Sequence, residues 1–213
     1  TETYKVTIDP ITTFEGGTGT IEDPYLISTA NQLSYMRYSS GKNFKLINDI
    51  DLSVYSSGEG WDPIDYFRNN LYGGDQGYVI YNLIINRPNE SFIGLFGRID
   101  SSTTSITNIH LKDINISGGG YVGGLAGSFS GIMSECSTDG LVNSVSSFAG
   151  GLVGYNYNGG DISESYSKAN ITSLSGRSVG GLIGENYGSL TNSYSGNNLI
   201  SSGAYRVAGL VGS

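Results

Sequence analysis

Cysteine and histidine are nearly absent from this chain. Cys136 is the only cysteine and His110 the only histidine among 213 residues. A single thiol cannot form an intrachain disulfide or a cysteine-based zinc site, so we expect Cys136 to be a small buried core residue. We expect His110 to face the surface from a strand rather than to act as a catalytic base. The sequence therefore predicts a protein that is not an enzyme, with no catalytic residues, no metal and no cofactor.

Positive charge and long apolar runs are also scarce. The chain has 11 Lys and Arg residues against 19 Asp and Glu, a net charge of −8, and the basic residues form no cluster. Nucleic-acid binding requires such residues to neutralise phosphates, so nucleic acid is excluded as a partner. No run of 18 apolar residues exists, which excludes membrane insertion within this segment.

Proline and charge are low, and small polar residues take their place. Four prolines are too few for a collagen or a proline-rich linker. Charged residues make up 14% of the chain, well below the ~25% of an ordinary globular domain. Ser, Thr, Asn and Tyr fill the gap, as is common in secreted β-proteins, so we expect an extracellular or cell-surface location. The chain starts at Thr1 without a leader, and we expect any export signal to lie outside this piece.

One tetrapeptide recurs along the second half of the chain. Gly-Leu-x-Gly occurs five times, at starts 27 to 30 residues apart: Gly94–Gly97, Gly124–Gly127, Gly151–Gly154, Gly181–Gly184 and Gly209–Gly212. A second apolar position lies between successive copies, at Ile106, Met133, Ile162 and Leu190. The number of residues from a tetrapeptide to the apolar position after it varies more than the number from that position to the next tetrapeptide. The corner just after the tetrapeptide is therefore a loop that tolerates changes in length, and the rest of the repeat is constrained.

The repeat length predicts the fold. Segments such as Ile162–Ser167 and Leu190–Ser195 are short and rich in Ser, Thr and Tyr, which is typical of strands. At ~3.3 Å per residue, 27 to 30 residues hold about three short strands and their corners. We therefore predict an all-β fold, a right-handed parallel β-helix with three sides. A β-sandwich is the alternative, but it would show turns every ~8–12 residues rather than this period.

Stacking of the coils assigns the apolar repeats to the interior. One coil cannot bury its own apolar face, so successive coils must stack. The tetrapeptide leucines would form one interior column and the second apolar positions another. The glycines would serve a sharp corner, which needs either a positive φ or a close approach of backbones.

The first ninety residues carry the pattern less regularly. Residues 28–37 are the best helix candidate, because Thr29 and Gln32 fit a capping box, and a short N-terminal helix would cap the open end of the stack. We divide the chain into a lead-in at 1–13 and one solenoid domain at 14–213. Within the domain, 14–93 form irregular coils, with a large loop over Ser53–Gly77, and 94–213 form regular coils. Because the chain stops one strand into a coil, we expect the natural protein to continue or this end to pack against another molecule.

These repeats resemble a known group. Val122–Gly127 and Val179–Gly184 are similar to the GLUG motif of bacterial surface and secreted proteins, including the region upstream of the protease domain in IgA-specific metalloproteases. The Gly-rich leader Phe14–Thr20 is similar to the start of such regions. The resemblance implies a module of a larger bacterial polypeptide with adjacent domains. The family's protease chemistry needs a His-Glu-x-x-His motif that this sequence lacks, so that activity is not implied.

The tolerant corner holds the candidate binding residues. Tyr155, Asn156 and Tyr157 lie there in one coil, and Asn186 and Tyr187 take the same places in the next. The asparagines could simply serve turn geometry while the tyrosines cover the edge of the core. Alternatively, the five side chains form a shallow aromatic and amide strip for a sugar or protein, because tyrosine offers contact area at low entropic cost.

Two function classes follow. The first is a non-catalytic structural and adhesion or binding module, with a host or matrix protein or a glycan as its partner. The alternative is a carbohydrate-binding or carbohydrate-active β-helix of the lyase or glycosidase kind, which would need clustered carboxylates. Candidates are Asp161, Glu164 and Glu185, although no spacing singles them out. Asp49 and Asp51 share a strand face, and we expect them to be structural rather than calcium ligands.

Overall fold

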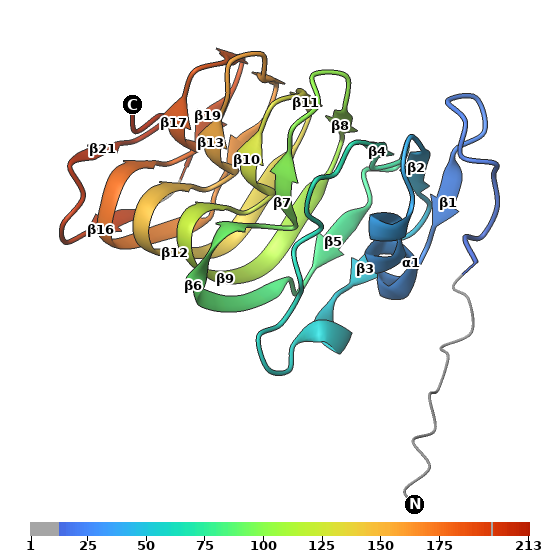
Figure 1. Ribbon diagram of the computed structural model, residues 1–213, viewed down its shortest axis with the longest axis horizontal. Helices are drawn as coiled ribbons and strands as arrows, with labels where there is room; N and C mark the ends of the chain where they lie inside the picture. Colours follow the sequence, from blue (N-terminus) through green and yellow to red (C-terminus); the bar gives the residue numbers. More distant parts are fainter. Residues whose placement is uncertain (1–12, 197) are drawn as a thin grey trace, which may run out of the picture.

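The computed structural model describes residues 13–196 and 198–213, which wind into a stack of coils that runs from β1 at one end to β21 near the other (Figure 1). Three sheets form its sides. Sheet A has seven short strands: β1 (Tyr25–Ile27), β2 (Asn43–Leu46), β4 (Asn70–Tyr72), β8 (Ser105–Thr107), β11 (Ile132–Ser134), β14 (Asp161–Ser163) and β18 (Ser189–Thr191).

The other two sheets complete each coil. Sheet C has four strands: β7 (Phe96–Ile99), β10 (Ala126–Phe129), β13 (Val153–Asn156) and β17 (Ile183–Asn186). Sheet B has ten: β3 (Ile50–Asp51), β5 (Val79–Tyr81), β6 (Ile84–Ile93), β9 (His110–Gly123), β12 (Ser137–Gly150), β15 (Tyr166–Ser167), β16 (Asn170–Gly180), β19 (Tyr194–Ser195), β20 (Leu199–Ser201) and β21 (Arg206–Ala208).

The pairing of the strands confirms the parallel β-solenoid. Each pair between named strands is parallel and joins one coil to the next; β10, for example, lies between β7 and β13. A β-sandwich would be built on antiparallel hairpins, and the one antiparallel contact among the described residues is an isolated bridge between Gly60 and Ile85.

The strands of one coil differ in length more than the sequence suggests. A coil consists of a three-residue strand in sheet A, a long bent strand in sheet B and a four-residue strand in sheet C, as in β11, β12 and β13. Strands β9 and β12 each have 14 residues and curve around one side of the stack (Figure 1). The expectation of three short strands is therefore wrong for this side.

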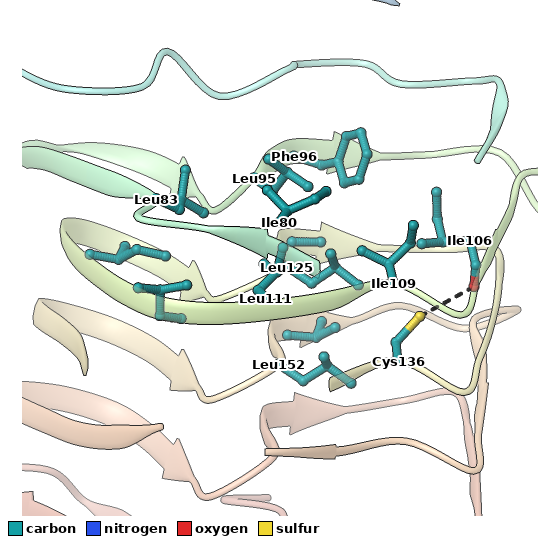
Figure 2. Close-up of a cluster of buried hydrophobic side chains, with 14 of the residues drawn as sticks. Ile80, Leu83, Leu95, Phe96, Ile106, Ile109, Leu111, Leu125, Cys136 and Leu152 are labelled. Carbon is teal, nitrogen blue, oxygen red and sulfur yellow. Dashed lines mark hydrogen bonds between the residues drawn. The ribbon is translucent and has the colours of Figure 1, made fainter. Parts of the chain in front are cut away.

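The two apolar columns lie in the interior as predicted except in the last coil, where the prediction is wrong for Leu210, which is 37% exposed, and where Leu190 is only partly buried. Leu95, Leu125, Leu152 and Leu182 are fully buried, and the Leu125 and Leu152 amides each donate a 2.9 Å bond to the carbonyl of the leucine in the next coil. Figure 2 shows three of these leucines one above another. The second column pairs in register and continues into the early coils through Phe44 and Leu71: Phe44, Leu71, Ile106, Met133, Ile162 and Leu190.

The tetrapeptide glycines are required by close approach rather than by backbone conformation. Positive φ values occur at other glycines, and none is found at the described glycines of the tetrapeptide. A Cβ on Gly151 would lie 2.5 Å from the Gly181 carbonyl oxygen, and one on Gly154 would lie 2.6 Å from the Gly127 oxygen. A larger residue at these two positions would push neighbouring coils apart, whereas a Cβ on Gly209 in the last tetrapeptide would have no atom within 4 Å.

A helix covers the first coil as predicted. α1 (Ala30–Tyr35) continues into the 3₁₀ turn η1 (Met36–Tyr38), beside β1 and β3 at the end of the stack (Figure 1). Thr29 and Gln32 form both bonds of the capping box. Leu33 and Met36 are fully buried against the core, so the helix closes the end of the stack with apolar side chains. Within the described ranges, no helix has the length and apolar character needed to cross a membrane.

The large loop expected over Ser53–Gly77 is wrong in part. After the 3₁₀ turn η2 (Ser53–Tyr55), the chain buries Trp61, Ile64 and Phe67. Ile64 bridges to Phe96 of β7, and β4 joins sheet A. The segment is thus a coil in its own right. The sequence did not indicate this coil, because the segment lacks the tetrapeptide and fills the interior with aromatic side chains.

The corner between sheets A and B places four residues in the left-handed region. Asn108, Glu135, Glu164 and Asn192 follow paired strands and have φ values of 57°, 56°, 49° and 48°. Asparagine tolerates this conformation, whereas glutamate does not favour it. The two glutamates therefore carry backbone strain that the asparagines largely avoid.

Substitution of Leu152 by alanine tests the interior column. We expect Leu152→Ala to lower the free energy of unfolding by about 2–5 kcal/mol, because it leaves a cavity between two packed coils. The exposed Leu174→Ala, on β16 with 60% of its surface accessible, should change it by no more than about 0.5 kcal/mol. Equal effects in urea unfolding would contradict the assignment of the column.

Relief of the strained corner tests the left-handed row. We expect Glu164→Asn to raise the free energy of unfolding by about 0.5–1 kcal/mol. A left-handed conformation costs most residues about 1–2 kcal/mol, and asparagine tolerates it better than glutamate does. Asp161→Asn removes an exposed carboxylate from the same coil without a positive φ and serves as the control for charge. A gain in both variants would assign the effect to charge instead.

Candidate functional site

The structure brings the five predicted binding residues together on neighbouring coils. Tyr155 and Asn156 lie in β13 and pair with Glu185 and Asn186 of β17. Tyr187 follows β17, and its amide donates to the Asn156 carbonyl at 2.8 Å. The shared register expected from the sequence is therefore present.

The side chains of Asn156 and Asn186 form hydrogen bonds that stabilise the turn at this corner. Asn156 is fully buried, and its Nδ2 donates to the Asn186 Oδ1 at 2.7 Å and to the Gly160 carbonyl at 3.3 Å. Asn186 Nδ2 donates in turn to the Gly188 carbonyl at 3.3 Å. These amides satisfy backbone groups of the turn, which is the structural role left open by the sequence. The side chain of Asn156 does not lie on the surface, so Asn186, which is half-buried, is the one amide of the predicted strip that reaches it.

The tyrosines form the outer part of this corner. The Tyr155 ring centroid lies 4.4 Å from that of Tyr157 and 5.6 Å from that of Tyr187. Tyr155 is half-buried, while Tyr157 and Tyr187 are 42% and 58% exposed. Burial raises the pKa of Tyr155 and of Tyr157, so both hydroxyls stay protonated and able to donate a hydrogen bond at neutral pH.

The aromatic surface extends further than the sequence indicated. Phe92, Tyr121 and Phe148 stack from coil to coil, with centroids 4.7 and 5.1 Å apart. Tyr121 and Phe148 lie 5.7 and 5.2 Å from Tyr155. Each of the three lies two or three residues before a tetrapeptide, so alignment on the tetrapeptide could have revealed this row. We call these six residues the aromatic corner: Phe92, Tyr121, Phe148, Tyr155, Tyr157 and Tyr187.

Arginines flank the aromatic corner at both ends of the row. The Arg98 guanidinium carbon lies 4.6 Å from the Phe92 centroid and 4.0 Å from that of Tyr66, and Asp65 pairs with the same guanidinium. Arg177 lies 5.8 Å from the Phe148 centroid. Cation–π contacts of this kind stabilise the ring positions, so the corner is preorganised.

A buried carboxylate lies beside the tyrosines. Glu185 is 4% exposed and accepts a 3.0 Å bond from the Tyr187 hydroxyl on Oε1. Its Oε2 is buried without a hydrogen-bond partner. A buried acceptor left unpaired costs free energy, so Glu185 Oε2 is a source of local instability beneath the tyrosines. Glu185 lies in the tolerant corner, but the sequence indicates it as a possible catalytic acid rather than as a binding residue.

The carboxylates considered for catalysis lie apart. Asp161 begins β14, Glu164 lies in the turn after it, and Glu185 lies in β17 of another sheet. Within the described part of the chain, no three His, Cys, Asp or Glu side chains come close enough to hold a metal ion. Asp49 and Asp51 accept 2.9 Å bonds from the Val79 amide and the Asn82 side chain of the following coil, which is the structural role expected of them.

Cys136 is a core residue, as expected. It is fully buried, and Sγ lies 3.5 Å from the Ile106 carbonyl oxygen (Figure 2). Burial raises the pKa of its thiol to about 12. The thiol is therefore protonated at neutral pH and does not act as a nucleophile.

His110 joins a short hydrogen-bonded chain on the outer face of sheet B. Its Nε2 lies 2.8 Å from the Asn108 Oδ1, and its Nδ1 lies 2.8 Å from the Ser137 Oγ. Because a carbonyl oxygen only accepts, Nε2 carries the proton, and Nδ1 accepts from the Ser137 hydroxyl. His110 is thus a half-buried strand residue with both ring nitrogens bonded.

The charge of His110 should make stability depend on pH. Burial lowers its pKa, partly offset by the charge of Glu135, so the unfolded chain binds a proton more readily than the folded one. The contribution of His110 to the free energy of unfolding should therefore be fully present above the unfolded pKa of ~6.5 and decrease as the pH falls below it. His110→Gln should flatten unfolding curves measured from pH 7.5 to 5.5. An unchanged slope would contradict this assignment.

Comparisons with known proteins agree with this architecture. The family model described as the GLUG motif matches residues 149–172. The chain is 34% identical over 181 residues to halomucin of Haloquadratum walsbyi and 38% identical over 135 residues to a protein of Evansella cellulosilytica provisionally named a Gly-rich membrane protein. These matches cover 79% and 59% of this chain but only 2% and 16% of the two relatives.

A solved structure shares the fold. It is a crystal structure from Bacteroides ovatus of a protein provisionally named an immunoglobulin A1 protease, with a TM-score of 0.51 and 21% identity. The match covers 93% of this chain and 86% of that one, and at this identity it concerns the fold alone. Of the repeat recognised in the sequence, and seen here as stacked coils, residues 149–172 thus match the GLUG motif.

Proposed function

We propose that this chain is a non-catalytic module of a larger exported protein, which uses it as a rigid spacer and as an adhesion surface outside the cell. The observation that carries the proposal is the aromatic corner, a continuous row of six rings from neighbouring coils with Glu185 beside it. Exposed aromatic residues held in place by their neighbours are typical of binding surfaces.

The spacer role is supported by the way the coils are joined. The coils from β7 to β17 are bonded to one another by parallel strands on three sides, so this part of the stack resists bending and holds its two ends apart. The small share of each relative that the chain covers supports a module within a longer polypeptide. The name of one relative, a membrane protein, supports a location at the cell surface.

The chemistry of the aromatic corner favours a host or matrix protein or a glycan as the partner. Tyr157 and Tyr187 present ring area, and their hydroxyl oxygens can accept hydrogen bonds from a ligand. Such a surface suits ligands that combine apolar area with hydroxyl or amide groups. Binding there would need no movement of the backbone.

Removal of the two exposed rings tests the adhesion role. We expect the double variant Tyr157→Ser/Tyr187→Ser to weaken binding to immobilised matrix proteins or glycans at least tenfold, about 1.4 kcal/mol, at a temperature well below its melting temperature. The control is Tyr205→Ser, because Tyr205 is 90% exposed and lies outside the aromatic corner. Equal binding by all three proteins, measured by biolayer interferometry, would contradict the proposal.

The same proteins distinguish the adhesion role from the alternative, a carbohydrate-active enzyme. An assay of reducing ends released from polysaccharides should give no turnover above the buffer rate. Turnover that Glu185→Gln abolishes, while binding persists, would replace the adhesion role with catalysis.

A further inference from the structure

A second surface, on sheet B, is unlike the aromatic corner. Paired positions on five successive strands place Val79, His110, Ser137, Tyr166 and Tyr194 in one outward row. Four of these side chains are bulky, and the serine lies between the His110 and Tyr166 rings. Because neighbouring strands lie ~4.8 Å apart, the two rings are separated by about twice that distance. The row therefore contains a notch with Ser137 at its floor.

The notch forms a defined cavity of about 260 Å³. The row and its neighbours line it: Val79, His110, Leu111, Lys112, Ser137, Thr138, Asp139, Tyr166 and Lys168. Sites for small molecules are concave and of ~300–1,000 Å³, so this cavity suits one small ring rather than an extended ligand. Its size follows directly from the small side chain at Ser137.

The walls of the notch are held before any ligand arrives. The ring of Tyr166 stacks on that of Tyr194 with centroids 4.9 Å apart and planes within 5°, so one face is covered and the ring is held in orientation. His110 is fixed by its bonds to Asn108 and Ser137. Preorganised walls reduce the entropic cost of binding.

The rim offers both donors and an acceptor. Lys112, Lys168 and Asp139 are exposed at its edge, and among the described residues none of the three takes part in an ion pair. The Lys168 ammonium lies 5.4 Å from the Tyr166 centroid. Glu135 adds a negative charge that acts on His110, so the rim has mixed charge rather than one sign.

We propose that this notch binds a single pyranose ring of a glycan. A sugar presents a flat apolar face of C–H groups to an aromatic ring and hydroxyls at its edge, and the notch pairs Tyr166 with lysine donors and the Asp139 acceptor. The backbone groups of β9, β12 and β15 are already paired within sheet B, so a peptide could not add as a strand. The mixed rim and the net charge of −8 disfavour a nucleic acid.

This proposal is independent of the aromatic corner, which lies at the C-terminal ends of β6, β9 and β12 and on the neighbouring β13 and β17, whereas the notch lies at the N-terminal ends of β9 and β12. Either surface can fail without the other. The corner variant Tyr157→Ser/Tyr187→Ser therefore serves as a control for the notch, and the notch variants serve as controls for the corner.

Titration with oligosaccharides, followed by amide chemical shifts, tests the notch. The probes are a neutral N-acetylglucosamine hexamer and an acidic galacturonate hexamer at millimolar concentration. We expect at least one to shift the amides of residues 110–112, 137–139 and 166–168. A response to galacturonate alone would assign the main contact to the lysines, and a response to both would assign it to the ring face.

Two variants complete the test. Ser137→Tyr fills the notch and should weaken binding at least tenfold. Asp139→Asn, at an exposed position, should weaken it several-fold with no change in melting temperature, which covers the case in which the larger substitution disturbs folding. The corner variant should bind as the native chain does. Absence of shifts with both probes, or shifts that survive both notch variants, would overturn the proposal.

Discussion

The fold depends on the close approach of neighbouring backbones at the Gly-Leu-x-Gly corner. The glycines allow one coil to lie against the next without a Cβ between them, as at Gly151 and Gly154. Once this spacing is fixed, the leucine after the first glycine enters the interior and the strand of sheet C pairs with its neighbours. The corner therefore sets the register of the coils from Gly94 onward.

A fixed register determines the outer surface as well as the core. Residues at equivalent places in successive coils lie about 4.8 Å apart, so a series of aromatic residues becomes a stacked row, as in Phe92, Tyr121 and Phe148. A small residue in a row of large ones becomes a cavity, as at Ser137. Both proposed binding surfaces follow from the same rule, applied to different outward positions.

Much of the interior could be predicted from the sequence because every coil must fill the same space. The leucine column and the second apolar column repeat for that reason. The early coil at β4 escaped notice because aromatic residues replace the tetrapeptide there.

The outer surface was less predictable. Outward side chains are free to differ between coils, so no repeat marks the notch, and the aromatic corner is marked only by the position of its rings relative to the tetrapeptide. Asparagine at the tolerant corner fits both a turn and a ligand site, and only the structure places Asn156 inside the turn. The left-handed conformation of Glu135 and Glu164 left no sign in the sequence, because packing imposes it on residues that do not favour it.

The stacked register is tested most directly by cysteine pairs in a Cys136→Ser background, where serine takes the place it has at Ser165 in the next coil. Ser134 pairs with Ser163 in the adjacent coil, and Ser163 pairs with Thr191 in the one after. Neighbouring strands bring Cα atoms within the ~4.4–6.8 Å of a disulfide, whereas two coils separate them by more than ~7 Å. Ser134→Cys/Ser163→Cys should therefore oxidise to an intrachain disulfide in the folded monomer, and Ser134→Cys/Thr191→Cys should stay reduced. Cross-linking of the second pair but not the first would contradict the account.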